Sequence, residues 1–237
     1  MKKLLFIAAC FSFISASAQT VDEIIRKYTD NMGGLDNFNK VKTVKFTATF
    51  STQGVDMPMT IQTINNRASR SEIDANGTTI IRAYKDGKGW TQNALAGINS
   101  PKEVTGTELI DYKAGCSLAN ALMDYKARGH QVELQGQETV EGLKTWKIKL
   151  TSKDDGRITT YFINVADNVL LKSAIDRDLQ GRTTTVETWY SNLKTFGDLK
   201  FFMTRDSKIE GETFQTATFN NIELNLPIDE KIFDMPK

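Results

Sequence analysis

Histidine and cysteine, the side chains most often used in metal binding and nucleophilic catalysis, are scarce in this chain. The 237 residues include one histidine, His130, and two cysteines, Cys10 and Cys116. These are too few for a zinc site of histidine and cysteine ligands. No Gly-x-Ser-x-Gly sequence accompanies His130, so a Ser-His-Asp hydrolase is the weakest of the functional hypotheses that we keep. We expect no catalytic residue, no metal and no cofactor, and we expect that the protein is not an enzyme.

Two charged pairs are the remaining candidates for chemistry. Asp154 and Asp155 precede Gly156, which is more typical of a hairpin turn than of a pair of catalytic carboxylates. Arg67 and Arg70 follow the Asn65-Asn66 turn. They are either solvated charges on an edge strand or guanidinium groups at the mouth of a cavity, where they would bind a lid carbonyl or a ligand head group.

The first 18 residues have the three parts of a secretory signal peptide. Lys2 and Lys3 form the charged region, residues 4–14 are apolar apart from Ser12, and Ala16-Ser17-Ala18 fits a cleavage site. The stretch before Cys10 also fits a lipid-modified cysteine, but the apolar run before it is too short. The sequence therefore predicts cleavage before Gln19 and release as a soluble protein. An acylated Cys10 is the alternative.

Charge and cysteine content limit the function classes. The formal net charge is +1, and loss of Lys2 and Lys3 would make it −1. A near-neutral chain has no electrostatic footprint for nucleic acid or an anionic membrane. After residue 18 no apolar run is long enough for a membrane span, and Cys116, the remaining cysteine, is expected to be a small buried residue. We expect one domain, residues 19–237.

Two kinds of hydrophobic period follow one another along the chain. Thr20 and Glu23 form a capping box at the start of an amphipathic helix that ends at Gly33-Gly34. From Val44 to Phe50 apolar and polar residues then alternate, which predicts a strand with one buried and one solvated face.

Turn signals predict a long series of antiparallel strands. Asn76-Gly77 and Asp86-Gly87 are strong hairpin signals, and later turns are expected at Glu141-Gly142, Asp155-Gly156, Asp167-Asn168, Gln180-Gly181 and Glu210-Gly211. We expect ten to eleven strands. A polar loop over residues 92–106 and a helical block over 105–128, broken at Gly115, interrupt them.

Such a sheet must curl, because twist accumulates from strand to strand. The fold class expected is mainly β (α+β), a curved antiparallel sheet that forms an open, incomplete β-barrel covered by an N-terminal helix and a helical lid. Too few helices are expected to fill its concave face, so the sheet should enclose an apolar cavity. The candidate lining residues are Phe46, Phe50, Met59, Ile61, Ile80, Tyr84, Trp90, Leu109, Leu122, Met123, Trp146, Ile148, Phe162 and Trp189.

Four stretches of the chain carry a family resemblance: "NNRASRSEIDANGTTIIRAYKDGKGWTQN", "GQETVEGLKTWKIKL", "TTYFINVADNVLLKSAIDRDLQGRTTTVETWYSNLK" and "EKIFDMPK". On these stretches the chain resembles the LolA/LolB-like superfamily over nearly all residues after the expected signal peptide. Ala68 stands where the superfamily usually has proline, and the Asp86–Trp90 turn is one residue shorter. The "SASAQ" stretch resembles the signal end of Bacteroidetes envelope proteins.

The resemblance implies a periplasmic carrier that binds the acyl chains of lipoproteins and delivers them to the outer membrane. It also implies an inner-membrane exporter and an outer-membrane acceptor as partners, and an arginine, here Arg67, that holds the lid closed. Carriers of this superfamily are soluble and the acceptor is lipid-anchored, so cleavage before Gln19 favours a carrier. The alternatives are a binder of another lipid, or an envelope sensor or protein-interaction module with the same fold.

Overall fold

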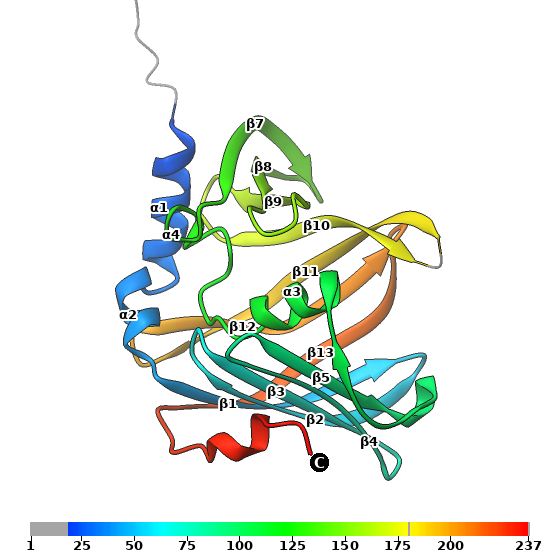
Figure 1. Ribbon diagram of the computed structural model, residues 1–237. Helices are drawn as coiled ribbons and strands as arrows, with labels where there is room; N and C mark the ends of the chain where they lie inside the picture. The colour runs from blue at the N-terminus through cyan, green and yellow to red at the C-terminus, as the bar shows by residue number, and fades with distance from the viewer. Residues whose placement is uncertain (1–18, 180, 237) are drawn as a thin grey trace, which may run out of the picture.

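A single antiparallel sheet organises the computed structural model, which describes residues 19–179 and 181–236 (Figure 1). Thirteen strands of these residues pair in the order β6-β5-β4-β3-β2-β1-β13-β12-β11-β10-β9-β8-β7. The expected signal peptide, residues 1–18, lies outside the described residues. The strands are β1 (Thr43–Thr52), β2 (Val55–Ile64), β3 (Ala68–Ala75), β4 (Thr78–Lys85), β5 (Lys88–Asn93), β6 (Ile98–Val104), β7 (Gln131–Val140), β8 (Leu143–Thr151), β9 (Ile158–Asn164), β10 (Leu170–Leu179), β11 (Arg182–Phe196), β12 (Leu199–Ile209) and β13 (Glu212–Leu224).

The expected count of ten to eleven strands was too low. One reason is β6, which occupies part of the expected polar loop and follows a short 3₁₀ turn, η1 (Ala94–Ala96). Pro101 lies within β6. Because β6 is an edge strand, the missing N–H of a proline can be tolerated there.

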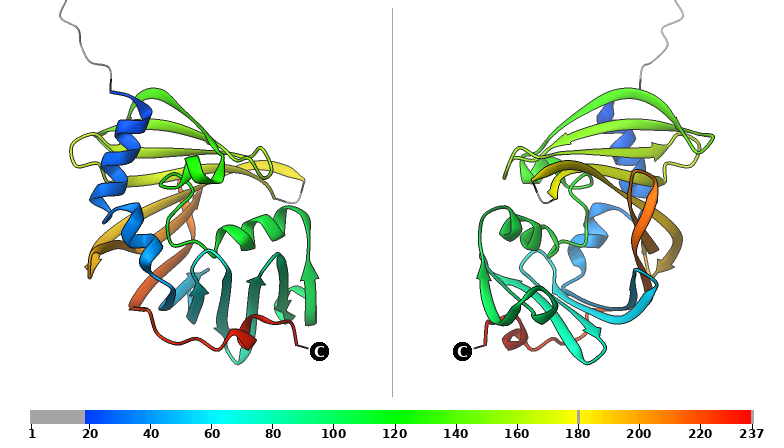
Figure 2. Two further views of the ribbon diagram at one scale, coloured as in Figure 1. Left: turned by 60° about the vertical axis from the view of Figure 1, so that its left-hand side comes forward. Right: turned by 90° about the vertical axis from the view of Figure 1, so that its right-hand side faces the viewer.

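The sheet is built from two sets of strands joined by one long-range pair. In the first set, the strands lie in sequence order from β1 at the centre of the sheet to β6 at one edge. In the second set, they lie in order from β7 at the other edge to β13 at the centre, where β13 pairs with β1. The two edges, β6 and β7, do not pair, so the sheet curls without closing into a barrel (Figure 2). This confirms the expected open, curved sheet. Since β6 and β7 are consecutive in the sequence, the segment between them must bridge the open side.

Hairpin turns form where the sequence predicts them. Asn76 and Gly77 have φ of 54° and 86°, and Asp86 and Gly87 have φ of 48° and 89°. Positive φ at both central residues is the type I′ geometry that matches the twist of the flanking strands. The expected turn at Gln180-Gly181 includes residue 180, which is outside the described residues.

The N-terminal helix α1 (Val21–Asn31) begins at the predicted capping box. The Thr20 hydroxyl accepts from the Glu23 N–H, and the Glu23 carboxylate accepts from the Thr20 N–H. Ile24, Ile25 and Tyr28 are buried against the sheet. The next turn leads into the short helix α2 (Leu35–Lys40), and both helices lie along one side of the curled sheet (Figure 2).

The predicted helical block is two short helices separated by an irregular segment. Helix α3 (Gly106–Ala114) ends at Gly115, as expected, and α4 (Tyr125–Arg128) follows residues 116–124. Helix α3 lies on the concave face of β3, β4 and β5, with Leu109 directed at Gly89. A Cβ at Gly89 would lie 2.9 Å from the Leu109 side chain, so glycine permits this close approach.

The C-terminal segment covers the opposite, convex face of the same strands. Its 3₁₀ turn, η2 (Glu230–Phe233), contacts β3 and β4, and Phe233 is 1% exposed. The Trp90 indole N–H donates to the Phe233 carbonyl at 2.9 Å. Figure 2 shows α3 and the C-terminal segment on opposite faces of this part of the sheet.

Candidate ligand-binding cavity

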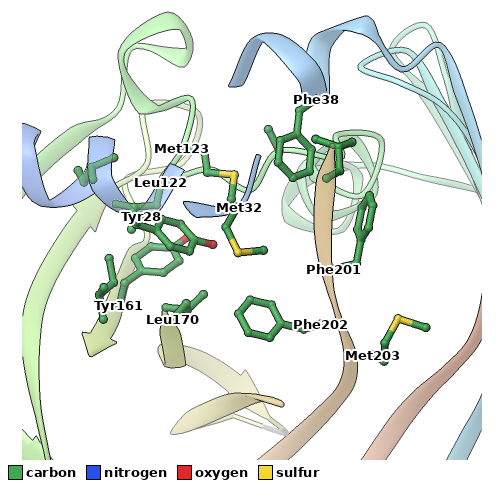
Figure 3. Close-up of a cluster of buried hydrophobic side chains, with 14 of the residues drawn as sticks. Tyr28, Met32, Phe38, Leu122, Met123, Tyr161, Leu170, Phe201, Phe202 and Met203 are labelled. Atoms are coloured by element: carbon green, nitrogen blue, oxygen red, sulfur yellow. The ribbon is translucent and has the colours of Figure 1, made fainter. Parts of the chain in front are cut away.

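A cavity of about 650 Å³ lies in the concavity of the sheet. Its volume is within the range of about 300–1,000 Å³ typical of small-molecule sites. Helices α1 and α2 supply Tyr28, Met32 and Phe38 to its wall, and strands from both sets supply the rest. Figure 3 shows side chains from these distant segments converging on one space. The strand residues on the wall include Phe46, Ile61, Tyr161, Leu170, Ile175, Tyr190, Phe201, Phe202 and Phe219.

Three of the candidate residues from the sequence line this cavity: Phe46, Ile61 and Met123. Five more belong to the hydrophobic core around it. Ile148 and Leu122 are fully buried, and Met59 is 8% exposed. Phe50 and Trp146 are partly buried against the core. These five support the walls.

Three other candidates lie beneath the α3 helix. Ile80 and Tyr84 are on the concave face of β4, because their partners across the ladders are Ile73 and Gly89. Leu109 on α3 approaches the same Gly89. These residues attach the helix to the sheet.

Trp90, Phe162 and Trp189 are on the convex face, which corrects the expectation that they line the cavity. Phe162 lies between Lys147 and Lys172, whose ammonium groups are 5.7 and 4.9 Å from its ring centre. Lys172 is also 5.0 Å from the ring of Trp189. Where a strand is regular, as it is around Phe162 and Trp189, an aromatic residue whose neighbours face the cavity points outward, because side chains alternate. Residue type alone does not give the face.

The sequence reasoning missed much of the cavity wall, including Tyr28, Met32, Phe38, Tyr190, Phe201, Phe202 and Phe219. The run Phe201-Phe202-Met203 was a usable signal. Three consecutive large apolar residues indicate a strand with both faces covered, and all three are buried. Helix α2 carries Phe38 and is only 6 residues long, too short for periodicity to predict.

The segment between β6 and β7 closes one side of the cavity. Ion pairs join it to residues on the far side of the opening in the sheet. Asp111 on α3 accepts from Arg157 at 2.7 Å and from Arg177 at 2.9 Å. Arg157 lies in the turn between β8 and β9 and Arg177 lies on β10, so both belong to the other half of the sheet. Burial of the Asp111 carboxyl opposes its ionisation, but the two arginines outweigh burial and hold its pKa below the ordinary value. Lys113, two residues onward, pairs with Asp154 at 3.3 Å.

The irregular segment after α3 is held by the turn between β2 and β3. The Asn66 N–H donates to the Cys116 carbonyl at 2.8 Å, and the Leu118 N–H donates to the Asn65 side chain at 3.1 Å. The Ser117 hydroxyl donates to the Asn66 side-chain oxygen at 2.5 Å. The segment is thus held by polar contacts at both ends of its span, with the cavity beneath it.

Solved structures share this arrangement, although no protein-family model matches the sequence and no curated protein matches it. A LolA superfamily protein from Nitrosomonas europaea is similar with a TM-score of 0.61 and 14% identity, over 92% of this chain and 98% of the other. The chain has the LolA superfamily fold.

Two further structures agree with this fold. A DUF1329 family protein from Desulfovibrio piger has a TM-score of 0.60 at 12% identity, with 92% of this chain and 98% of the other covered. A putative outer membrane lipoprotein-sorting protein domain from Vibrio parahaemolyticus has a TM-score of 0.59 at 11% identity, with 91% and 97% covered. At these identities the likeness establishes the LolA superfamily fold and leaves the ligand open.

Arg67, the residue that the resemblance placed at the lid, makes its contacts on the other face of this fold. Its guanidinium donates to both carboxylate oxygens of Glu230, at 2.9 and 2.7 Å, and to Asp86 at 3.1 Å. Arg70 donates to the Ile232 carbonyl at 2.7 Å and stacks 5.3 Å from the centre of Trp90. Both arginines hold the C-terminal segment. Within the described residues, the neighbouring Asn65-Asn66 turn, and neither arginine, contacts the segment between β6 and β7, through the hydrogen bonds to Cys116 and Leu118.

The three candidates for chemistry have structural roles. Burial lowers the pKa of His130, and its Nδ1 accepts from the Lys153 N–H at 3.1 Å, as a neutral imidazole does. Cys116 is buried as expected, which raises the pKa of its thiol to about 12. The Asp155 carboxylate accepts from the Arg157 N–H at 3.1 Å, which confirms a turn.

Two features are absent from the described residues, 19–179 and 181–236. No group of three or more His, Cys, Asp or Glu side chains there is arranged to hold a metal ion. No helix in that part of the chain has the length and apolar character needed to cross a membrane.

Proposed function

We propose that this protein binds acyl chains in its cavity and carries lipid-bearing cargo, lipoproteins first, through the periplasm to the outer membrane. The observation that carries the proposal is the cavity of about 650 Å³ with an aromatic and aliphatic wall beneath a helical segment. An acyl chain in water costs about 0.8 kcal/mol per exposed CH₂. A carrier must therefore cover the chain during transfer, and a cavity of this size and lining does so.

A carrier must also release its cargo, and the helical segment suits that task. Its contacts across the open side, from Asp111 to Arg157 and from Lys113 to Asp154, are between charged groups. Water can replace such contacts when they separate, whereas separating an apolar interface would expose hydrocarbon. We infer that the α3 part of the segment opens as a lid by moving away from the turn between β8 and β9 and from β10, while its attachment at Asn65-Asn66 holds and the buried Leu122 stays in the core.

The fold supports this function by analogy. One of the similar structures is described as a putative outer membrane lipoprotein-sorting domain. By the same analogy the partners are an inner-membrane exporter and an outer-membrane acceptor, and the location follows from cleavage of residues 1–18. The alternative is a binder of another lipid, or a sensor or protein-interaction module that uses the same fold without cargo.

A cavity-filling variant tests acyl-chain binding. Ile61 lines the cavity, and Ile158 is 48% exposed outside it, so Ile61→Trp and Ile158→Trp are a matched pair. The purified proteins would be examined by native mass spectrometry for co-purified acyl species and titrated with a fluorescent fatty-acyl probe. We expect wild type and Ile158→Trp to bind and Ile61→Trp to bind weakly. An empty wild-type protein that also ignores the probe would exclude the carrier.

A further inference from the structure

The charged side chains that line the cavity are not balanced. Four carboxylates line it, Asp111, Asp124, Asp154 and Asp155. Each of them is within 4.0 Å of a lysine or arginine nitrogen. Arg205 and Lys200 also line the cavity, and the Lys200 ammonium group donates to the Asn31 side-chain oxygen at 2.9 Å, whereas Arg205 has no such polar side-chain partner in the described residues. Among the described residues, no carboxylate is within 4.0 Å of the Arg205 guanidinium.

Arg205 is placed on the apolar wall by the pairing of its strand. Its partners across the ladders are Tyr190 on β11 and Ala217 on β13. Ala217 in turn pairs with Phe50 on the concave face of β1. The guanidinium lies 5.0 Å from the ring centre of Phe219, which is 7% exposed and also lines the cavity. Arg205 therefore presents a cation beside the hydrocarbon-lined space.

Hydroxyl groups add further donors to the same cavity. The Tyr28 hydroxyl accepts from the Asn120 side-chain N–H at 2.7 Å, so its own proton is free to donate. Burial raises the pKa of Tyr28 far above its ordinary value, while the charge of Arg205 acts in the opposite direction. Tyr28 is thus a neutral hydrogen-bond donor. Figure 3 shows its ring beside Tyr161 and Leu170.

We propose that the cavity binds an amphiphile with one anionic head group, which pairs with Arg205 while its acyl chain lies along the apolar wall. Carboxylate and phosphate heads share the required chemistry, since the planar guanidinium forms bidentate hydrogen bonds with both. This proposal rests on the proposed acyl-chain binding and adds a charge to the ligand. It predicts a preference that an uncharged acyl chain would not show.

Displacement of a fluorescent fatty-acyl probe from the full purified protein tests the charge requirement. The competitors are dodecanoate, monododecyl phosphate, dodecanol and dodecyltrimethylammonium, all with the same chain length. Acetate and inorganic phosphate are the controls for the head group alone. Because the Arg205 side chain is exposed to solvent, which weakens an ion pair, we expect at least one dodecyl anion to bind about fivefold more tightly than dodecanol.

Two variants complete the experiment. Arg205→Gln should remove the preference for the anion and leave dodecanol binding unchanged. Arg182→Gln, which makes the same charge change at a side chain that is 82% exposed, should bind as wild type does. Thermal unfolding of each variant reports whether the fold is retained.

The outcomes separate this proposal from the proposed function. If no competitor displaces the probe and the probe itself does not bind, acyl-chain binding fails and this proposal fails with it. If dodecanol competes as well as both anions in wild type, the anionic site is wrong while acyl-chain binding stands. Displacement by acetate or inorganic phosphate alone would also overturn it, because the site would then not need the chain.

Discussion

Asp111 on helix α3 binds Arg157, from the turn between β8 and β9, at 2.7 Å. Helix α3 packs on β3, β4 and β5, and Arg157 lies beside β8 and β9, near the other, unpaired edge of the sheet. The ion pair between Asp111 and Arg157 therefore joins the two sides of the opening above the cavity. Arg177 on β10 adds a second pair with the same carboxylate at 2.9 Å. One aspartate therefore holds the helical segment to the far side of the open sheet.

Replacing Asp111 with asparagine should loosen the lid without unfolding the protein. The carboxylate is one-third exposed, so solvent screening limits the loss of unfolding free energy to about 1 kcal/mol. We expect an acyl probe to dissociate several-fold faster from Asp111→Asn, as measured by stopped-flow fluorescence. Asp198→Asn, at an exposed turn between β11 and β12, is the control. Equal dissociation rates for Asp111→Asn and wild type would show that this aspartate does not hold the lid.

The same aspartate gives the lid a dependence on acid. Hydrogen bonds from Arg157 and Arg177 overcome burial and keep the pKa of Asp111 below its ordinary value. A carboxyl with a lowered pKa stabilises the folded state above the unfolded pKa, and this stabilisation is lost as pH falls through the folded pKa. Probe dissociation should be constant from about pH 7 to pH 5 and rise below about pH 4. Asp111→Asn should show no such rise, and a midpoint near neutral pH would contradict this assignment.

Gly33 should not tolerate a side chain. It has φ of +114°, and a Cβ there would lie 2.2 Å from the backbone oxygen of Asp198. The Lys200 N–H donates to the Met32 carbonyl at 2.9 Å, so the two chains cannot separate easily. We expect Gly33→Ala to lower the unfolding free energy by more than about 2 kcal/mol. Gly211→Ala, which also has positive φ but open space around it, should cost about 1–2 kcal/mol. Denaturant unfolding measures both, and equal losses would contradict the clash.

Local sequence patterns predicted most of the helices, strands and turns of this fold. The shape of the cavity depends on contacts between residues far apart in the sequence, which those patterns do not show. The turn at Asn76-Gly77 follows from local backbone chemistry, and the helix start at Thr20 follows from a capping box. The pairing of β1 with β13, which sets the curvature, has no local signal, because it joins residues such as Val44 and Leu224. The contact between Asp111 and Arg157 likewise depends on how the segment crosses the opening.

The face of each aromatic residue was also beyond local reasoning. Trp90 and Trp189 were expected in the cavity because large aromatic residues are usually buried. Trp90 is indeed 3% exposed, but the C-terminal segment buries it from the convex side. Nothing in the sequence around Trp90 shows that residues near 233 cover it. When both faces of a strand are covered, its sequence does not show which face lies toward the cavity.

Cys116 should resist thiol reagents until the lid segment opens. It is 2% exposed, and burial raises its pKa to about 12, so the reactive thiolate is scarce at neutral pH. We expect labelling by a maleimide at pH 8 to be far slower than for a free thiol and to accelerate in Asp111→Asn. Labelling that is equally slow in the variant, with normal labelling after denaturation, would show that the segment near Cys116 stays closed when Asp111 is lost.

Arg67→Leu tests whether Arg67 or Asp111 holds the lid closed. Arg67 binds Glu230 and Asp86 on the convex face, whereas Asp111 acts at the open side of the cavity. Loss of Arg67 should free the C-terminal segment, which limited proteolysis near residue 230 would detect, and should lower Tm slightly. Probe dissociation should stay at the wild-type rate, because no Arg67 contact within the described residues reaches the helical segment. Faster probe dissociation from Arg67→Leu than from Asp111→Asn would show that Arg67 holds the lid closed. The C-terminal segment would then have to act on the lid through the sheet.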